Sequence, residues 1–356
     1  MTGRVIVTGG AGYFGSHVTR RLLSSGYRVG VLDALLFGNG LNDFNGVANL
    51  EVVRGDTRSI ADLSRLLRGV DCEIHLAAIV GDAACSVDPD VTWTTNLEAT
   101  KLIVDACRHY GVKRLIFAST CSVYGASDDL LLNEGSLCRP LSLYAQTRLE
   151  SERICLDAAS PDLVVTCLRM ATLFGLSPRM RFDLVVNIMT ARGNAERVVT
   201  VFGGEQWRPL VHVADAADAF VAALEAPEEI ANAQIFNVGS NEQNLQILEV
   251  GRRVAAVCGA RVQLQAPSLE DRRNYRVSFD KIARLLSFEA RRTIESGAAE
   301  IVQHLSVHPE MDYLHDRHHN HRFPYAIDPA ILPSHRPRLR ASDDAELSRA
   351  VNGVSA

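Results

Sequence analysis

The sequence predicts an α/β protein in which a doubly wound parallel sheet precedes a smaller C-terminal lobe. Short β-branched runs alternate with helical stretches through the first half of the chain, a rhythm typical of strand–helix–strand units. A glycine-rich turn joins the first run to the first helical stretch, and an aspartate ends the second run. Strands joined through helices pair in parallel, so helices are expected on both faces of the sheet.

The individual elements follow from apolar spacing and from the residues that stop each run. In the first predicted helix, Val18, Leu22 and Leu23 share one face, and Gly26 ends it. Strands are expected at residues 4–8, 27–32, 50–54, 72–76, 114–118, 163–169 and 234–238, and helices at 16–25, 97–110 and 144–158.

The turn between the first strand and the first helix reads Gly-Gly-Ala-Gly-Tyr-Phe-Gly-Ser-His at residues 9–17. Gly10, Gly12 and Gly15 match G-x-G-x-x-G, which allows a sharp turn, close approach to a pyrophosphate and tight packing of helix on strand. The N–H groups that open the helix then face the phosphates. Asp33 ends the second strand, where a carboxylate binds the ribose hydroxyls and repels a 2′-phosphate. The combination predicts a Rossmann-type site for NAD rather than NADP.

The strand–helix rhythm changes after about residue 175. Less regular elements follow, and from Val307 onward prolines and polar residues accumulate. We therefore expect residues 1–175, with late elements from about 210–240, to form the NAD-binding Rossmann domain. Residues 176–306 would form mainly a substrate-binding lobe. Residues 307–356 would be a C-terminal extension that lies on the surface or is partly disordered.

Composition and charge argue against several other classes of function. A net charge of −5 gives no general attraction to nucleic acid or an anionic membrane. The apolar runs fall short of the roughly 20 residues that a membrane helix needs, and no secretory signal pattern is visible, so a cytoplasmic protein is expected. No metal site is expected, because the eight cysteines form no Cys-x-x-Cys pair and no cysteine accompanies the histidines His315, His318, His319 and His321.

Eight motifs occur in the order found in one enzyme family. Beyond the glycine loop they are Arg-Gly-Asp (54–56), His-Leu-Ala-Ala (75–78), Ser-Thr-Cys-Ser-Val-Tyr-Gly (119–125), Tyr-Ala-Gln-Thr-Arg (144–148), Leu-Arg-Met-Ala-Thr-Leu-Phe-Gly (168–175), Gln-Trp-Arg-Pro-Leu-Val-His-Val (206–213) and Phe-Asn-Val-Gly (236–239). From about residue 3 to 305 the chain thus resembles the extended short-chain dehydrogenase/reductase superfamily, in its branch of NAD-dependent nucleotide-sugar epimerases and dehydratases. The resemblance implies NAD as cofactor, a nucleotide-diphosphate sugar as substrate and a homodimer held by the helices at 97–110 and 144–158.

The resemblance also implies roles for individual residues. Thr120, Tyr144 and Arg148 would form the catalytic group, and Tyr144 and Arg148 would also contact NAD. Further cofactor contacts would come from Gly9, Gly12, Tyr13, Phe14, Gly15, Asp33, Asp56, Thr57, Leu76, Ala77 and Ala78, with Asp56 at the adenine. The sugar nucleotide would contact Thr120, Cys121, Ser122, Thr172, Asn187, Arg208 and Arg272, with the two arginines at its diphosphate.

The chemistry of the proposed catalytic group is consistent with these residue types. Oxidising a sugar alcohol requires loss of the hydroxyl proton while hydride leaves the carbon atom. A tyrosine phenolate can take that proton if a nearby cation lowers its pKa from about 10. Tyr144 and Arg148 are four residues apart, so they project from one face of a helix. A buried tyrosine beside an arginine that extends to water is the structural alternative.

Two departures from the family pattern bear on the reaction. Arg148 stands where the family has lysine; it keeps the charge but cannot join a proton relay, which leaves open a catalytically weak NAD-binding scaffold or sensor. Dehydratases of the branch place an Asp-Glu pair after the catalytic threonine, whereas this chain has Cys121 and Ser122. An epimerase acting through a transient keto-sugar, at C4, is therefore favoured, with a ketoreductase or an atypical dehydratase as alternatives.

Three further side chains have alternative interpretations. Cys121 could act as an acid or base, although a small side chain that shapes the sugar pocket is the favoured reading. Arg179 and Arg181 could bind a phosphate or a sugar carboxylate, or they could be exposed loop charges.

Overall fold

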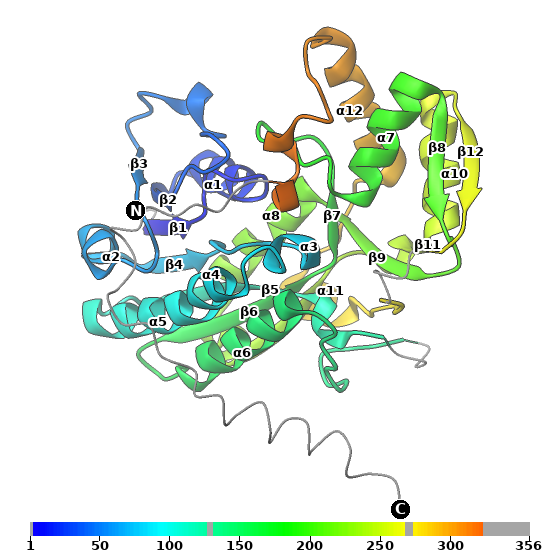
Figure 1. Ribbon diagram of the computed structural model, residues 1–356. Helices are drawn as coiled ribbons and strands as arrows, with labels where there is room; N and C mark the ends of the chain where they lie inside the picture. The colour runs from blue at the N-terminus through cyan, green and yellow to red at the C-terminus, as the bar shows by residue number, and fades with distance from the viewer. Residues whose placement is uncertain (1–2, 127–130, 268–272, 323–356) are drawn as a thin grey trace, which may run out of the picture. The chain divides into compact units, whose positions relative to one another are not determined.

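A seven-stranded sheet forms the centre of the fold in a computed structural model that describes residues 3–126, 131–267 and 273–322. The strand order is β10-β6-β5-β4-β1-β2-β3, and every neighbouring pair is parallel (Figure 1). The order reverses between β1 and β4, the position at which open parallel sheets bind ligands. The strands are β1 (Arg4–Thr8), β2 (Arg28–Asp33), β3 (Leu50–Arg54), β4 (Cys72–His75), β5 (Arg114–Thr120), β6 (Val164–Met170) and β10 (Gln234–Val238).

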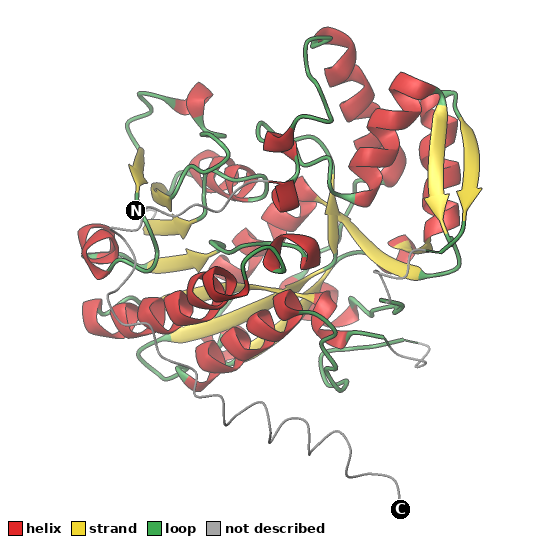
Figure 2. Ribbon diagram, in the orientation of Figure 1, coloured by secondary structure: helices red, strands yellow, loops and turns green. Residues whose placement is uncertain are grey.

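Helices cover both faces of this sheet, as the sequence predicts (Figure 2). One core joins the sheet to α1 (Gly15–Ser24), α8 (Val213–Glu225) and α11 (Asp280–Leu286). The other core joins it to α2 (Ile60–Leu67), α5 (Ala99–Tyr110) and α6 (Leu143–Asp157). The predicted apolar face of the first helix is confirmed, because Val18 and Leu22 are fully buried in the first core.

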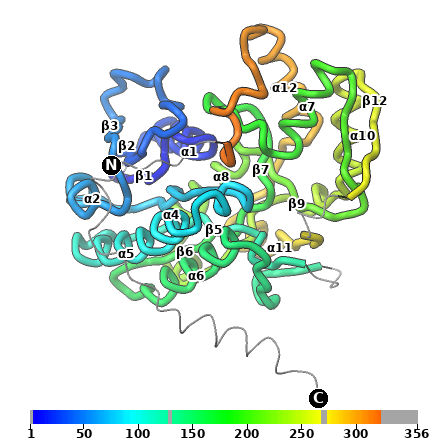
Figure 3. The backbone as a smooth tube through the Cα atoms, viewed as in Figure 1, coloured from blue at the N-terminus to red at the C-terminus, as the bar shows by residue number. Residues whose placement is uncertain are grey.

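A second lobe is built from two small sheets and three helices, and Figure 3 traces their path. Strands β7 (Thr172–Phe174), β9 (Trp207–His212) and β11 (Asn244–Gln246) form one sheet, and β8 (Val198–Phe202) pairs in parallel with β12 (Arg261–Gln265). Helices α7 (Val185–Glu196), α10 (Ile247–Cys258) and α12 (Ile294–Val307) pack with these strands around their own apolar core. The expected late return to the main sheet is made by α8 and β10.

Short helical segments occupy the connections between these elements. They are η1 (Asn42–Phe44), α3 (Asp82–Cys85), α4 (Pro89–Trp93), the π-helical turn η2 (Thr94–Glu98), η3 (Cys121–Tyr124), α9 (Glu228–Ala231), η4 (Asn241–Gln243), η5 (Asp316–His318) and η6 (Asn320–Arg322). Across the described parts of the chain, no helix is both long and apolar enough to span a membrane.

The segment after α12 is predicted to be a surface or partly disordered extension. Most of its residues from 307 to 317 are exposed, whereas His318, His319 and Asn320 are buried. Their polar groups bond to the protein, which makes their burial possible despite their composition. The rest of the predicted extension, residues 323–356, lies outside the described residues.

Candidate active site

The glycine loop lies at the carboxyl edge of the sheet, between β1 and α1. Gly9 has a φ of +73°, and a side chain there would bring its Cβ within 2.8 Å of the Ala77 backbone nitrogen. A Cβ at Gly15 would collide with the carbonyl oxygen of Gly9. The turn can therefore form only with glycine at these positions. This packing brings the predicted cofactor residues of the loop against those that follow β4.

Asp33 ends β2 and is fixed by the same loop. Its carboxylate accepts hydrogen bonds from the backbone N–H groups of Ala11, at 3.0 Å, and Leu35, at 2.8 Å. Burial raises the pKa of Asp33, while these two donors and the charge of Arg179 oppose the rise. The acid therefore stands beside the glycine turn, as expected of a ribose ligand.

Asp56 and Thr57, expected at the adenine end, follow β3. Asp56 accepts hydrogen bonds from the Arg58 backbone N–H at 2.9 Å and from its guanidinium Nε at 3.0 Å. Thr57 is buried. The carboxylate of Asp56 thus already has a cationic partner, and an adenine contact would have to share it with Arg58.

Thr120 and Tyr144 come from two elements in contact, at the end of β5 and near the start of α6. Thr120 is the last residue of β5, and its hydroxyl accepts a hydrogen bond from the Ser122 N–H at 3.1 Å. Tyr144 lies in the first turn of α6, which Ser142 caps by accepting from the Ala145 N–H at 3.2 Å. Ser142 also donates to Asp82 at 2.6 Å, which ties the start of α6 to the loop after β4.

Arg148 is buried one helical turn after Tyr144. Its guanidinium donates to the carbonyl oxygen of Ala118 in β5 and lies 4.3 Å from the centre of the Phe117 ring. The alternative of an arginine that extends to water is wrong, because the residue is 2% exposed. Burial raises the pKa of Tyr144, and the positive charges of Arg148 and Arg181 oppose the rise. The cation therefore favours the phenolate while being held by the strand backbone.

Arg181 is a charged residue near Tyr144 to which the sequence assigned no catalytic role. It forms a two-pronged ion pair with Asp183, at 3.0 and 2.8 Å, and it is buried, as is Arg179. The reading of these two arginines as exposed loop charges is therefore wrong. Their presence in a Pro-Arg-Met-Arg segment was the only sequence signal.

Several predicted substrate residues are engaged by the protein itself. The Cys121 thiol donates to the carbonyl oxygen of Arg169 at 3.3 Å, and burial raises its pKa, which opposes an acid–base role. Asn187 is fully buried; its amide nitrogen donates to the Tyr13 hydroxyl at 3.2 Å and to the Arg181 carbonyl at 2.9 Å. Asn187 therefore holds the loop after β7 against the glycine turn.

The remaining substrate positions are only partly described. Arg208 is buried in β9, where its guanidinium donates to the carbonyl oxygens of Trp207, at 2.8 Å, and Arg273. Thr172 is half-buried at the start of β7. Arg272, the second arginine expected at the diphosphate, lies outside the described residues.

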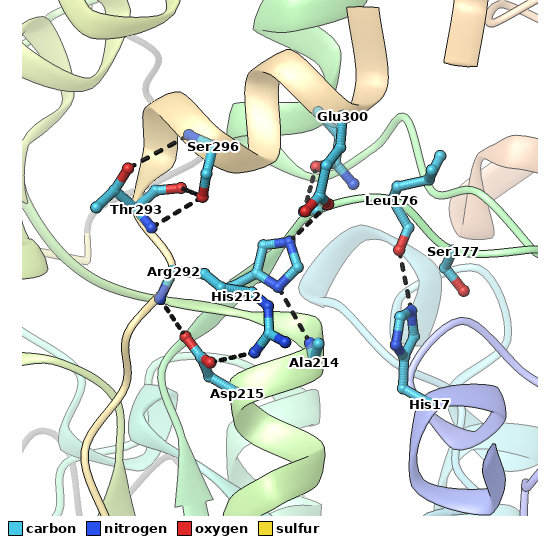
Figure 4. Close-up of polar contacts among 12 residues, drawn as sticks. His17, Leu176, Ser177, His212, Ala214, Asp215, Arg292, Thr293, Ser296 and Glu300 are labelled. Carbon is cyan, nitrogen blue, oxygen red and sulfur yellow. Dashed lines mark hydrogen bonds and ion pairs between the residues drawn. The ribbon is translucent and has the colours of Figure 1, made fainter. Parts of the chain in front are cut away.

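Polar contacts anchor the second lobe beside the glycine loop (Figure 4). His17 of α1 donates from Nε2 to the Leu176 carbonyl at 2.9 Å. Ser177 donates to the Tyr13 carbonyl at 2.7 Å. His212, at the end of β9, lies 3.1 Å from Glu300 of α12. The contacts of His17 and Ser177 set the position of the loop after β7 relative to the glycine turn.

The fold and site define a dinucleotide-dependent enzyme. The glycine turn, the acid at the end of β2, and Thr120 and Tyr144, which are predicted to be catalytic together with Arg148, are consistent with this class. Residues 5–239 match the model of the NAD dependent epimerase/dehydratase family, and the chain belongs to that family. It is thus an NAD-dependent enzyme of the extended short-chain dehydrogenase/reductase type.

Relatives match along nearly their whole length. A UDP-glucose 4-epimerase of Bacillus subtilis is 29% identical over 327 residues, which span 83% of this chain and 95% of the relative. The structure of a UDP-glucose 4-epimerase from Thermotoga maritima with UDP-glucose has a TM-score of 0.77 and 26% identity, and covers 86% of this chain and 99% of its own. The structure of a UDP-glucuronic acid 4-epimerase from Bacillus cereus, in complex with UDP-glucuronic acid and NAD, has a TM-score of 0.76 and 27% identity. The match covers 85% of this chain and 99% of that structure's chain.

Proposed function

We propose that this protein is an NAD-dependent epimerase that inverts C4 of a nucleotide-diphosphate sugar through a transient 4-keto sugar. Tyr144 is the acid–base residue, Thr120 positions the reacting hydroxyl, and Arg148 is the cation that favours the phenolate. NAD, when bound, accepts hydride from the sugar carbon and returns it. Similarity to 4-epimerases named for UDP-glucose and UDP-glucuronic acid supports a UDP-sugar as substrate.

The proton chemistry follows from the positions of the two hydroxyl groups. Tyr144, as phenolate, takes the C4 hydroxyl proton while the C4–H bond breaks, and it returns the proton when the carbonyl group is reduced. Thr120 shares a hydrogen bond with the same substrate oxygen. Both lie at the carboxyl edge of the sheet, on β5 and α6, beside the cofactor loop. Inversion then requires only that the keto-sugar presents its other face to the cofactor.

The observation that carries epimerisation over dehydration is the absence of carboxylates after Thr120. Loss of water from C5 and C6 needs an acid and a base, and Cys121 and Ser122 occupy the positions where such groups would stand. The Cys121 thiol is buried with a raised pKa, so it does not replace a carboxylate. A 4-epimerase or a ketoreductase needs no such pair.

A non-catalytic NAD-binding scaffold is the second candidate, and the setting of Arg148 favours it. One guanidinium nitrogen, Nη2, donates to the Ala118 carbonyl and the group lies over the Phe117 ring, while Nε and Nη1 have no hydrogen-bond partner among the described residues. A lysine with a free terminal amine can move protons, which this arginine cannot do. The two functions differ in one measurable property, which is turnover of a sugar nucleotide by the NAD-loaded protein.

The test is to incubate the NAD-loaded protein with UDP-glucose and, separately, with UDP-glucuronic acid, each deuterated at C4. Epimerisation predicts the C4 epimer with its deuterium retained, because the same hydride returns to the same carbon. In a second incubation, with unlabelled substrate in deuterium oxide, deuterium from solvent at C3 or C5 would contradict the 4-keto route. NAD-loaded protein that converts no sugar nucleotide in a wider panel would favour the scaffold.

The matched variants for this test are Tyr144→Phe and Tyr110→Phe. Tyr144→Phe is expected to abolish turnover while keeping NAD bound. Tyr110 ends α5, at the far end of the helix from the site, and its substitution should leave turnover unchanged. Turnover by Tyr144→Phe at the parental rate would remove Tyr144 from its role.

We also propose that the protein is a cytoplasmic homodimer that pairs through α5 and α6. Val87 and Trp93, beside these helices, are 52% and 42% exposed, which supports an apolar contact there. Light scattering should give twice the chain mass, and Trp93→Glu should halve it. A monomeric parent protein would contradict the pairing.

A further inference from the structure

The segment from Tyr313 to Arg322 turns back from the end of α12 to the catalytic edge of the main sheet. Figure 1 shows it in dark orange, returning toward α3. Two structural relatives cover 99% of their own length but only 85–86% of this chain, so about 50 of the 356 residues have no counterpart in them. The segment begins after about residue 305, where the predicted family resemblance ends.

Asn320 joins the loop after β4 to the loop after β7. Its amide nitrogen donates to the carbonyl oxygen of Val80, in the loop after β4, at 3.1 Å. Its amide oxygen accepts from the Arg179 guanidinium, in the loop after β7, at 2.6 Å. Its backbone N–H donates to Asp183 in that second loop at 3.3 Å. A side chain of 6% exposure thus bridges the two lobes.

The two bridged loops are those that flank the predicted cofactor. Val80 follows Ala77 and Ala78, which pack on the glycine turn. Arg179 lies 3.9 Å from the centre of the Phe37 ring, in the loop that follows Asp33, and its charge acts on the Asp33 carboxylate. A bridge between them therefore links the loop that packs on the glycine turn to the arginine whose charge acts on Asp33.

The segment is held to the second lobe by backbone and aromatic contacts. The Phe182 N–H donates to the His318 carbonyl at 2.9 Å, and the His318 ring donates to the Met180 carbonyl at 3.2 Å. The Phe182 ring makes edge contacts with the Tyr313 and His318 rings. Anchored to this lobe at several points, the segment reaches the main sheet through the Asn320 amide.

We propose that residues 313–322 form a strap over the predicted NAD site, and that Asn320 is the positioning residue that closes it and retains NAD. The strap rests on NAD use by the family and not on the substrate proposed above. A retained cofactor suits a reaction in which the hydride is returned within each turnover. NAD would then leave only when the bridge between Val80 and Arg179 opens.

The test measures exchange of bound NAD in the full-length protein. NAD-loaded protein is mixed with excess deuterated NAD, and the labelled fraction of protein-bound cofactor is followed by mass spectrometry. Loss of the bridge in Asn320→Ala should speed exchange about tenfold, the equivalent of about 1.4 kcal/mol, which is typical of a lost buried hydrogen bond. Asn320→Asp keeps an acceptor for Arg179 but cannot donate to Val80, so it should also exchange faster. His321→Ala is the matched control, because His321 is exposed in the same turn.

The outcomes separate a strap from a merely structural segment. Faster exchange in both Asn320 variants, with thermal midpoints near that of the parent, supports the strap. Exchange within twofold of the parent in Asn320→Ala overturns it, even if the thermal midpoint falls. A parental exchange rate in Asn320→Asp alone overturns the bridge to Val80. Because the readout is cofactor exchange, it is independent of whether any UDP-sugar is epimerised.

Discussion

Replacing Arg148 with methionine should shift the pH dependence of turnover to higher pH. Burial already raises the pKa of Tyr144, and the groups that act on it are few. Arg148 and Arg181 lower the pKa, whereas Cys85 and Asp82 raise it. Removing the largest of the lowering charges leaves less phenolate at any given pH, so turnover that depends on phenolate must fall at neutral pH and recover at alkaline pH.

The size of the shift follows from the helical spacing of the pair. Residues four apart lie on one face of a helix, and among the groups that lower the pKa of Tyr144 the charge of Arg148 has the largest effect. A nearby opposite charge lowers a pKa by about 1–3 units. The acid limb of the kcat profile should therefore move up by about 1–3 pH units, and kcat near pH 7 should fall about tenfold to a thousandfold. Loss of the hydrogen bond to the Ala118 carbonyl should lower the free energy of unfolding by about 1–3 kcal/mol. This loss is partly offset because an uncharged side chain is easier to bury than a guanidinium.

The assay is the pH profile of kcat for the sugar nucleotide that the parent protein converts, with bound NAD and the thermal midpoint measured on each variant. Arg148→Lys is the matched control, because it keeps the charge and should keep the profile close to that of the parent. An Arg148→Met protein with bound NAD and an unshifted acid limb would refute the reasoning. Tyr144 would then not owe its ionisation to this cation.

Three further substitutions test the physical arguments about the fold. Glu152→Gln breaks a buried two-pronged ion pair with Arg169, at 2.6 and 3.0 Å, and should lower the free energy of unfolding in urea by about 3–5 kcal/mol. Glu150→Gln, in an exposed ion pair on the same helix, should lower it by less than about 1 kcal/mol. Equal losses in the two variants would contradict the argument. Burial raises the pKa of Glu73 to about 8, so the folded state loses stability as pH rises from about 4.5 through 8. The free energy of unfolding of Glu73→Gln should therefore exceed that of the parent by on the order of 3–5 kcal/mol at pH 8 and match it near pH 4. Equal free energies of unfolding at pH 8 would rule out a buried acid with a raised pKa. Gly15→Ala forces a Cβ onto a backbone carbonyl, so it should lower the thermal midpoint and abolish NAD binding, and retained NAD would contradict the tight turn.

The spacing of apolar residues along the chain was sufficient to predict most strands of the main sheet. The strands at 4–8, 50–54 and 234–238 lie where the apolar runs predict them. The first helix buries the face that its periodicity indicates, because helices and strands of this kind are set by short-range pattern. Strand β5 extends two residues further than expected, to Thr120, because it pairs with β6 as far as Met170. The pairing with β6 is a tertiary contact, which the residues of β5 alone do not specify.

The sequence by itself determined the parallel α/β architecture, the glycine turn, the acid at Asp33 and the family motifs, because each depends on residues near one another in the chain. Only the tertiary structure decided that Arg148 is held by Ala118, that Arg181 pairs with Asp183 near Tyr144, and that Asn320 reaches the loop after β4. Those outcomes depend on burial and on partners up to 240 residues apart. A polar or charged side chain must find such partners to be buried, and composition alone does not specify which ones it finds.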